Sequence, residues 1–312
     1  MNFEHFLKNP KDKSVIIICG PTAVGKTAVA ISIAKYFRTE IISADSRQCF
    51  KELKIGVARP SDEELKEISH HFIASWSIKE NINAAFFEKF ALQKAEELFK
   101  THDIIIMVGG TGLYIKAFCE SLDEIPPIDE AIRKNIIKDF ELHGLPWLQE
   151  QVKRMDTQFY NVGEIQNPQR LMRALEVIES TGQSILSFRK NKKAERPFNI
   201  IKIGLELPKE ELHENINSRV DKMLQDGLVE EVSSLKDYCD VNALQTVGYS
   251  EIFEHLDGKT SLANAVEEIK KNTRQYAKRQ MTWFKKDKEI SWVNAKQRRE
   301  ITSMAQKLAD RH

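Results

Sequence analysis

Short runs of aliphatic residues recur in the first half of the chain and predict buried β-strands. Val15–Cys19 and Ile104–Val108 are uninterrupted apolar runs, and Ile41–Ser43 is a shorter one. Buried parallel strands have this continuous apolar character because both faces of their sheet are covered. Apolar residues at helical spacing occupy Thr27–Phe37 and Ala84–Lys100 between these runs. Strand and helix therefore alternate, which predicts a doubly wound α/β domain with a parallel sheet.

The middle of the chain lacks strand patterns and predicts a helical insertion. It begins at Asp123–Pro127 and extends to about Arg196, with Gly182 as the C-cap of its last helix. The helical stretches are Ile132–His143, Trp147–Met155 and Pro168–Ser180. A strand pattern returns at Ile200–Leu207 and is followed by the helical stretches Glu210–Asp226, Val229–Tyr238 and Leu262–Phe284. We therefore predict a core domain from 1–124 and 197–312, with basic C-terminal helices, and a helical insertion domain at 125–196.

Composition and charge narrow the class of protein only slightly. The chain has 312 residues, of which 41% are hydrophobic and 30% charged, as in ordinary globular proteins. The formal net charge of +1 predicts no partner, but the charge is uneven. Lys271–His312 holds twelve Lys and Arg against four Asp and Glu, and such a basic region can bind a polyanion.

Cysteine usage and hydropathy indicate a protein of a reducing compartment. The four cysteines form no CxxC pair and match no zinc-ligand spacing; they are Cys19, Cys49, Cys119 and Cys239. The longest aliphatic runs are far too short to cross a membrane, and residues 1–13 show no apolar signal segment. We expect a soluble, cytoplasmic protein without a membrane partner.

A phosphate-binding loop follows the first predicted strand. The sequence GPTAVGKT at Gly20–Thr27 matches GxxxxGK[ST], with a strand before it and a helix after it. Its glycines let consecutive backbone N–H groups face one anion, and the helix adds its positive N-terminal end. Lys26 supplies a cation, and the Thr27 hydroxyl is placed to ligate Mg²⁺. The residues predicted to bind phosphate are Gly20, Pro21, Thr22, Ala23, Val24, Gly25, Lys26 and Thr27. A purely structural glycine turn is the disfavoured alternative.

The machinery for nucleotide hydrolysis is not evident. Enzymes that hydrolyse ATP or GTP at such a loop usually have an acidic residue after a hydrophobic strand, where it helps to hold Mg²⁺. The matching strand, Ile104–Val108, is followed by Gly109–Gly112, and Asp103 lies at its other end. The loop is therefore predicted to bind a diphosphate without this hydrolytic arrangement.

Asp45 follows the second predicted strand and is the second candidate for chemistry. The carboxyl ends of strands in an open α/β sheet face the ligand crevice, so Asp45 is expected near the phosphate loop. A carboxylate there could act as a base or contact Mg²⁺ through water. The alternative is an ordinary helix N-cap, because Asp caps helices well.

Several motifs together resemble the tRNA dimethylallyltransferase family. They run in order along nearly the whole chain, as GPTAVGKT (Gly20–Thr27), DSRQ (Asp45–Gln48), IGVARP (Ile55–Pro60), HHFI (His70–Ile73), VGGTGLYIKA (Val108–Ala117), NPQRLMRALEV (Asn167–Val177), VGYSEI (Val247–Ile252) and RQYAKRQMTWFKK (Arg274–Lys286). The resemblance implies a P-loop NTPase-like parallel sheet core with an inserted helical domain. Phe50 and Val57 depart from the residues usual in the family, Tyr and Thr. The chain lacks the cysteines of the C-terminal zinc finger found in eukaryotic relatives, so it resembles the short bacterial type.

The resemblance implies a prenyl transfer that uses Mg²⁺. Dimethylallyl diphosphate would lose diphosphate, and N6 of adenosine 37, next to the anticodon, would take the five-carbon group in tRNAs that read codons beginning with U. Asp45 would be the general base. Thr111 would hydrogen-bond near the reacting base or the bridging oxygen of the diphosphate, and Arg219 would reach the same diphosphate. Without the resemblance, a helix N-cap remains open for Thr111, and a solvated helix arginine is favoured for Arg219.

The resemblance also implies contacts with the anticodon stem-loop of tRNA. The target base must leave its stack, and Gln48 could read an adenine edge. Lys271–Lys286 has interleaved basic and aromatic residues, which is usually a solvated helix face but here suits RNA. The residues expected to contact tRNA are Asp45, Ser46, Arg47, Gln48, Thr111, Arg133, Gln169, Arg170, Leu171, Met172, Arg173, Gln245, Gly248, Tyr249, Arg279, Gln280 and Trp283. Nothing in the sequence demands more than a monomer.

Two other functions compete with this interpretation. A small-molecule kinase using ATP would explain Lys26 and Asp45 but neither the basic tail nor the missing carboxylate after Val108. A regulatory NTPase that binds RNA would perform no transfer. The phosphate loop alone favours the kinase, and the family resemblance favours the prenyltransferase.

Overall fold

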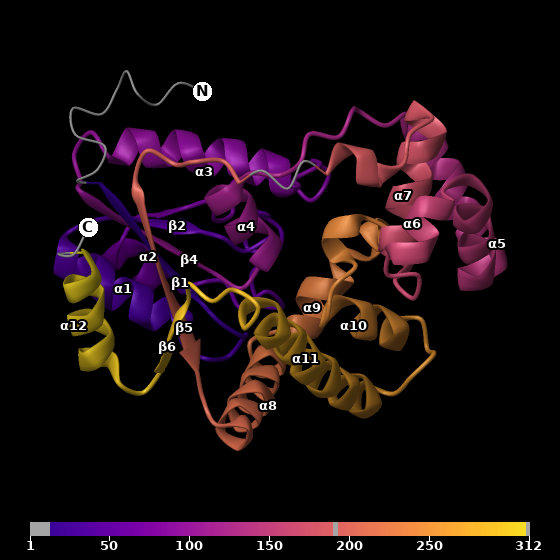
Figure 1. Cartoon of the computed structure of the whole chain (residues 1–312). Helices are drawn as coiled ribbons and strands as arrows, with labels where there is room; N and C mark the ends of the chain where they lie inside the picture. The colour runs from indigo at the N-terminus through magenta and orange to yellow at the C-terminus, as the bar shows by residue number, and fades with distance from the viewer. Residues whose placement is uncertain (1–12, 190–192, 310–312) are drawn as a thin grey trace. The chain divides into compact units, whose positions relative to one another are not determined.

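The chain folds as two compact units. The computed structural model describes residues 13–189 and 193–309 (Figure 1). One unit combines Met1–Glu120 with Glu195–His312, and the other is Ser121–Ala194. The sequence analysis predicted the boundaries of the second unit at residues 125 and 196, within four residues of those observed.

The first unit is built on a six-stranded sheet in the order β3-β2-β4-β1-β5-β6. Every neighbouring pair is parallel, and in the register Ser14 lies opposite both Ile104 and Asn199. The strands are β1 (Ser14–Cys19), β2 (Ile41–Ser43), β3 (His70–His71), β4 (Ile104–Gly109), β5 (Asn199–Glu206) and β6 (Ser291–Asn294). The predicted α/β class and the parallel sheet are confirmed. The edge strands β3 and β6 were not predicted, because both are short and carry polar residues.

Helices pack around this sheet. They are α1 (Lys26–Phe37), α2 (Asp62–Glu67), α3 (Ala84–Leu98), α4 (Gly112–Glu120), α8 (Lys209–Gln225), α9 (Leu228–Ser233), α10 (Tyr249–Leu256), α11 (Leu262–Phe284) and α12 (Arg298–Ala309). The 3₁₀ helices are η4 (Lys236–Tyr238) and η5 (Asn242–Leu244). The predicted helix Val229–Tyr238 is thus two pieces, because α9 ends at Ser233 before η4 begins.

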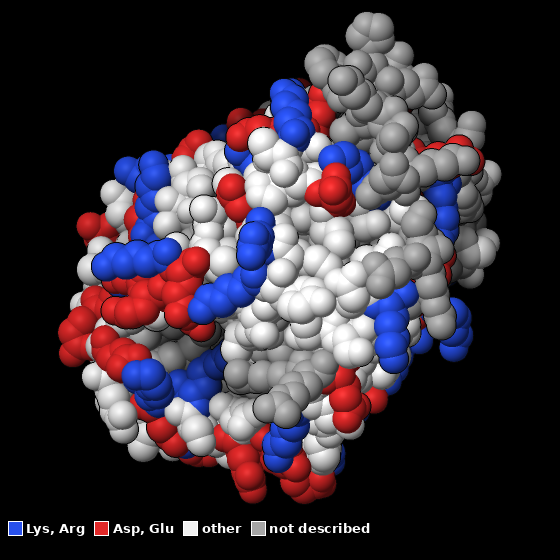
Figure 2. Space-filling model, turned by 90° about the vertical axis from the view of Figure 1, so that its left-hand side faces the viewer, with Lys and Arg blue, Asp and Glu red and all other residues white. Residues whose placement is uncertain are grey.

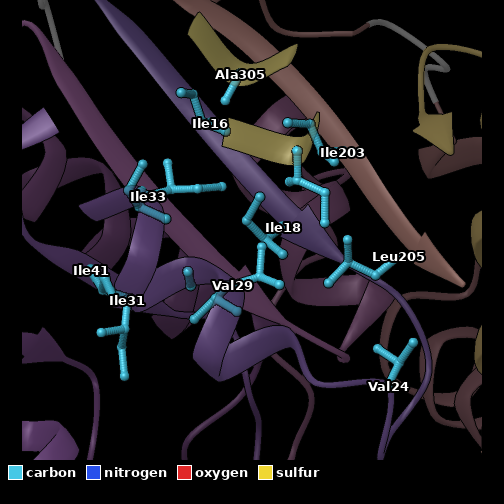
Figure 3. Close-up of a cluster of buried hydrophobic side chains, with 14 of the residues drawn as sticks. Ile16, Ile18, Val24, Val29, Ile31, Ile33, Ile41, Ile203, Leu205 and Ala305 are labelled. Carbon is cyan, nitrogen blue, oxygen red and sulfur yellow. The ribbon is translucent and has the colours of Figure 1, made fainter. Parts of the chain in front are cut away.

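A hydrophobic cluster fixes the sheet against α1 and α12 (Figure 3). Ile16 and Ile18 of β1 point into this cluster because alternate side chains of a strand face the same side. Val29 and Ile33 of α1 and Ala305 of α12 meet them there. Full burial of such aliphatic side chains stabilises the fold by about 1.5 to 3 kcal/mol each. The cluster therefore holds the start of α1 firmly beside the end of β1.

The second unit is helical, as predicted. It consists of α5 (Glu130–Met155), α6 (Thr157–Val162), α7 (Pro168–Thr181) and the 3₁₀ helix η3 (Ile185–Phe188), which enclose their own core. Gly144 interrupts α5 with φ of 71°, which separates the two helices predicted there. Asn167 caps the start of α7, and Gly182 closes it with φ of 70°, the left-handed conformation that favours glycine.

Charged side chains of both signs are interspersed on the face shown in Figure 2. Among the described residues visible there, Lys and Arg have Asp and Glu neighbours rather than forming a continuous basic surface. This face therefore offers no single-sign field for a polyanion. In residues 13–189 and 193–309, no helix is both long and apolar enough to cross a membrane.

Candidate active site

A cavity of about 320 Å³ lies where the strands of the first unit end. Thr22, Gly25 and Thr27 of the phosphate loop line it together with Asp45 and Val108, which lie at the carboxyl ends of β2 and β4. The central position of β1 between β4 and β5 brings these loops together. The site thus occupies the crevice that parallel α/β sheets commonly offer to ligands.

The phosphate loop has the backbone geometry that its sequence predicts. Gly20 has φ of 141°, and a Cβ atom there would come within 2.5 Å of the Leu205 carbonyl oxygen on β5. Gly25 has φ of 94° and is the N-cap of α1, so the helix N-terminus opens at the loop. Lys26 Nζ donates a hydrogen bond of 2.7 Å to the Pro21 carbonyl. The loop is therefore closed on itself around the Lys26 ammonium group.

Lys26 is poised to respond to an anion. Its burial, and then the nearby Arg219 cation, lower the pKa of its ammonium group to about 8, while Asp45 acts in the opposite direction. A bound diphosphate would favour the charged form, because opposite charges in a site of low dielectric attract strongly. The cavity therefore holds positive charge that a phosphate group would stabilise.

Arg219 reaches the phosphate loop from α8. Its Nη1 atom donates a hydrogen bond of 3.2 Å to the Thr22 hydroxyl, and burial lowers the pKa of its guanidinium group. Asn215, one turn earlier on the same helix, donates from Nδ2 to the Ala23 carbonyl at 3.2 Å. The structure thus places Arg219 beside the loop rather than on a solvated helix face, and its contact with a diphosphate stays a prediction.

Asp45 both shapes a turn and lines the cavity. Its Oδ1 atom accepts hydrogen bonds from the backbone N–H groups of Arg47 at 2.9 Å and Gln48 at 3.1 Å. The Oδ2 atom makes no hydrogen bond within residues 13–189 and 193–309. Residues 46–49 form a turn and not a helix, so the helix N-cap alternative is wrong, and the Asp45 carboxylate holds a turn instead. Holding the turn and a chemical role are compatible, since each uses a different oxygen.

Thr111 supports the turn that carries Asp45. Its Oγ1 atom accepts a hydrogen bond of 3.0 Å from the Ser46 backbone N–H and lies 3.3 Å from the Ser46 hydroxyl. Thr111 lies just before α4 and is not among the residues that line the cavity. The geometry therefore ties Thr111 to the Asp45–Gln48 turn, and a contact with substrate stays a prediction.

Gln280 of α11 joins the phosphate loop to the end of β4. Its Oε1 atom accepts from the Thr22 backbone N–H at 2.8 Å, and its Nε2 atom donates to the Gly110 carbonyl at 2.9 Å. The side chain lines the cavity, yet both ends of its amide are paired with backbone. The Gln280 amide is therefore a structural bridge, and its contact with RNA stays a prediction.

A second cavity of about 570 Å³ adjoins the first. Thr22, Asp45, Arg219 and Tyr276 line both cavities. The predicted RNA contacts that line the second one are Asp45, Ser46, Arg47, Gln245, Gly248 and Arg279. Trp283, also predicted, is partly exposed on α11, and a Cβ atom at Gly112 would lie 2.2 Å from its ring. The second cavity therefore brings the arginines Arg47, Arg219 and Arg279 to the same space as Asp45.

The structure corrects three of the predicted RNA contacts. Tyr249, Leu171 and Met172 have buried side chains, with the last two in the core of the helical unit. Sequence motifs do not distinguish residues that are needed for packing from residues that contact a ligand.

Gln48 needs a smaller correction. Its Nε2 group donates to the carbonyls of Val57 at 3.1 Å and Ala58 at 3.0 Å, so its donors are already engaged. Only the Oε1 acceptor remains, and paired hydrogen bonds with an adenine edge would require an exchange of partners.

The other predicted RNA contacts lie in the helical unit. Arg133 and Arg173 both approach the Glu176 carboxylate, at 3.7 and 3.0 Å, and Arg170 pairs with Glu164 at 2.7 Å. Gln169 is exposed in the first turn of α7. These residues are therefore accessible or partly accessible, and their contact with RNA stays a prediction.

The residues of the first cavity fit a magnesium ion. Mg²⁺ prefers oxygen ligands, keeps several waters and commonly shares substrate phosphates with one or two protein groups. The Thr27 hydroxyl and the Asp45 carboxylate line the same cavity and supply such oxygens. In the described part of the chain, no group of three or more His, Cys, Asp or Glu residues is gathered to hold a metal by itself.

Several lining residues were not identified from the sequence as site residues. Arg59 and His70 belong to motifs that carry the family resemblance, so those motifs could have indicated them. Tyr276 lines both cavities, and its burial raises the pKa of its hydroxyl to about 12. Tyr276 lies in the motif Arg274–Lys286, which could have indicated it. Asn215, which bonds the Ala23 carbonyl of the loop, has no local signal, because only helix packing brings it there.

Comparisons with known proteins identify the family. The family described as IPP transferase matches residues 48–287. The tRNA dimethylallyltransferases of Christiangramia forsetii and Cytophaga hutchinsonii are 50% and 46% identical to this chain, covering 89% and 94% of it and 92% and 96% of their own lengths. The solved tRNA isopentenylpyrophosphate transferase of Bacillus halodurans is 32% identical with a TM-score of 0.71, covering 96% of this chain and 98% of its own. A eukaryotic dimethylallyltransferase solved acting on tRNA is 25% identical with a TM-score of 0.74, covering 91% and 74%. The chain therefore belongs to the IPP transferase family, that of the tRNA dimethylallyltransferases.

Proposed function

We propose that this protein transfers a dimethylallyl group from dimethylallyl diphosphate to N6 of adenosine 37 in tRNAs that read codons beginning with U. The product is N6-dimethylallyladenosine, and the partner is the anticodon stem-loop. The observation that carries the proposal is the meeting of Lys26, Arg219 and Asp45 in one cavity of a chain from this family. The cations Lys26 and Arg219 suit a diphosphate, and the Asp45 carboxylate can serve as the proton acceptor.

The chemistry requires charge to be stabilised on the leaving diphosphate. N6 bonds to C1 of the dimethylallyl group while the bond from C1 to the diphosphate oxygen breaks, and the electron pair leaves with that oxygen. The remaining backbone N–H groups of the phosphate loop, the Lys26 ammonium and the Arg219 guanidinium would stabilise this charge; Pro21 has no N–H, and that of Thr22 is bonded to Gln280. When bound, magnesium would supply further positive charge beside the diphosphate, with the Thr27 hydroxyl as its protein ligand.

Asp45 is the group best placed to take the proton. The amine of adenine is a weak nucleophile and loses a proton as its new bond to carbon forms. The Asp45 Oδ2 atom is the candidate acceptor because Oδ1 is engaged by the backbone of Arg47 and Gln48. The turn therefore holds the carboxylate in place while one oxygen remains available.

The target base would approach through the second cavity. Arg47 and Arg279 line that cavity and suit the phosphates of RNA, and Tyr276 offers an aromatic face for stacking. Enzymes that modify a base generally extract it from its stack into a pocket. We propose that the protein acts as a monomer in the cytoplasm, where tRNA is modified.

The direct test is mass spectrometry of tRNA nucleosides. Unmodified tRNA is incubated with the protein, dimethylallyl diphosphate and Mg²⁺, and digested to nucleosides. The expected result is N6-dimethylallyladenosine at position 37, with none when dimethylallyl diphosphate is replaced by ATP. Robust ATP hydrolysis without any prenylated nucleoside would contradict the proposal. The kinase alternative, which the phosphate loop alone favours, lacks the carboxylate expected after β4, since that strand ends at Gly109.

A further inference from the structure

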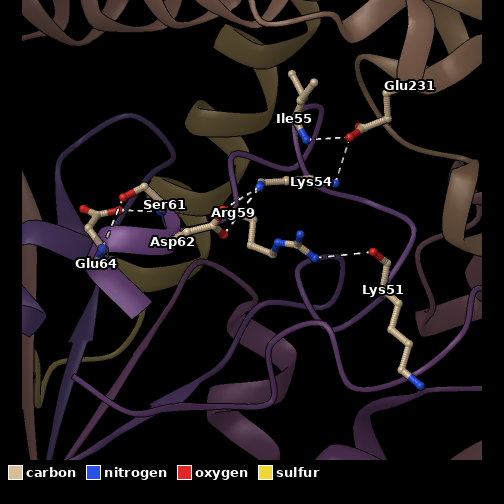
Figure 4. A network of polar contacts seen from close by, with 8 residues as sticks. All are labelled: Lys51, Lys54, Ile55, Arg59, Ser61, Asp62, Glu64 and Glu231. Atoms are coloured by element: carbon tan, nitrogen blue, oxygen red, sulfur yellow. Dashed lines mark hydrogen bonds and ion pairs between the residues drawn. The ribbon is translucent and has the colours of Figure 1, made fainter. Parts of the chain in front are cut away.

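The Glu231 carboxylate on α9 collects four hydrogen-bond donors, two of which, the N–H groups of Lys54 and Ile55, are drawn in Figure 4. Its Oε2 atom accepts from the backbone N–H groups of Lys54 at 3.0 Å and Ile55 at 2.8 Å. Its Oε1 atom accepts from the Gly56 N–H at 3.0 Å and from the Tyr249 hydroxyl at 2.6 Å. Hydrogen bonds to an ionised carboxylate are about twice as strong as neutral ones. Glu231 thus anchors a segment of backbone more than 170 residues away in sequence.

The anchored segment, residues 54–58, forms a wall of both cavities. Val57 and Ala58 line the first and the second cavity, and Gly56 lines the second. Gly56 packs on Tyr249, because a Cβ atom at Gly56 would lie 2.5 Å from the Tyr249 ring. Ala58 has φ of 47°, a left-handed conformation that a residue with a side chain adopts only when its surroundings hold it. The wall therefore needs its anchor to keep this shape.

The wall is connected to Asp45 through Gln48. The carbonyls of Val57 and Ala58 accept both hydrogen bonds of the Gln48 Nε2 group. The Gln48 backbone N–H in turn donates to Asp45 Oδ1. Glu231 does not line either cavity, so its effect on chemistry can act only through these contacts.

We infer that Glu231 is a positioning residue for prenyl transfer, which holds the 54–58 wall and, through Gln48, the turn that carries Asp45. This inference rests on the proposed function. The Oε1 atom of Glu231 and the ring of Tyr249 together fix the position of Gly56. The position of Gly56 in turn fixes where Val57 and Ala58, the next residues of the wall, lie. Lys54 and Arg59 extend the same network, Lys54 to the Asp62 carboxylate at 3.1 Å and Arg59 to the Lys51 carbonyl at 3.4 Å (Figure 4).

The test compares Glu231→Gln with the matched control Glu230→Gln. Glutamine replaces one carboxylate oxygen by an amino group, which cannot accept from the two donors that meet there. Glu230 is an exposed neighbour on the same helix and makes no hydrogen bond from its side chain to the described residues. Tyr249→Phe is a graded variant, because it removes only one of the four donors.

Single-turnover transfer and amide hydrogen exchange are measured on the full chain. For Glu231→Gln, transfer at saturating donor and tRNA is expected to slow by about 10- to 100-fold, the scale of a misplaced reacting group. The KM for dimethylallyl diphosphate should change less than about threefold, since no residue of the phosphate loop contacts Glu231. The amides of residues 54–56 should exchange faster. Glu230→Gln should match the wild type, and Tyr249→Phe should fall between.

The outcomes separate this inference from the proposed function. If the wild type transfers the prenyl group and Glu231→Gln is equally active, the positioning role is refuted but the proposed function stands. The same holds if the 54–56 amides of Glu231→Gln exchange as in the wild type. An inactive wild type refutes the proposed function and the positioning role together. If Glu231→Gln does not fold, the test uses Tyr249→Phe instead. A transfer rate and an amide exchange pattern of Tyr249→Phe that equal those of the wild type then refute the inference.

Discussion

Replacing Asp45 by Asn separates its two roles, because Oδ1 and Oδ2 serve different partners. The Asn side chain can keep an oxygen toward the N–H groups of Arg47 and Gln48, which lie 2.9 and 3.1 Å from Oδ1 in the wild type. Its amino group then takes the place of Oδ2, which carries the basicity. Asn and Asp side chains both hold such turns by bonding the backbone two residues on, so the turn should survive.

The size of the effect follows from the lost proton acceptor. A positioned general base contributes about 10²- to 10⁴-fold to a rate, which corresponds to about 3 to 5 kcal/mol of activation free energy. Loss of a hydrogen bond that holds such a turn costs only about 1 kcal/mol of stability. Asp45→Asn should therefore reduce the transfer rate strongly with little change in the free energy of unfolding, whereas Asp45→Ala should lower both.

The assay is single-turnover prenyl transfer with separate measurement of donor binding. Donor affinity at pH 7 should change little, or increase, because a carboxylate near the diphosphate has been neutralised. Asp257→Asn, at a surface ion pair with Lys236 and Lys259, serves as a control for the substitution itself. Transfer by Asp45→Asn at near wild-type rate would refute the assignment of Asp45 as the base. A defect confined to donor affinity, and relieved by added Mg²⁺, would indicate a metal-positioning role instead.

Three further predictions concern the phosphate loop. The pKa of Lys26 is lowered to about 8, so its charge is present below that pH and lost above it; donor affinity, measured by titration calorimetry, should be constant near pH 7 and fall as pH rises through about 8. A pH-independent affinity would contradict the role of Lys26. Gly20→Ala should cost about 2 to 4 kcal/mol of unfolding free energy in urea, since its Cβ atom would lie 2.5 Å from a backbone oxygen, whereas Gly182→Ala, with open space around it, should cost only about 1 to 2 kcal/mol. Gln280→Leu should cost about 2 to 4 kcal/mol and weaken donor binding, because it strips partners from the Thr22 N–H and the Gly110 carbonyl; a fully stable variant with normal donor affinity would count against the bridge.

The central strands and the phosphate loop were predictable because their signals are local. A continuous apolar run, a glycine-rich turn and a helix start lie within about two dozen consecutive residues, and short-range backbone constraints decide their conformation. The helical unit was predictable for a similar reason, since its caps Asn167 and Gly182 act within their own helix. The edge strands escaped because β3 and β6 owe their conformation to pairing with a neighbour rather than to their own residues.

The sequence by itself determined the fold class, the phosphate loop and the family resemblance. Only the tertiary structure decided which side chains meet there, because these contacts join residues far apart in the chain. Thr22 and Gln280 are 258 residues apart, and no periodicity or spacing reports such a pair. Burial likewise decided that Tyr249 packs against the 54–56 backbone instead of facing RNA. Helix packing sets these distances, and packing depends on the whole core at once.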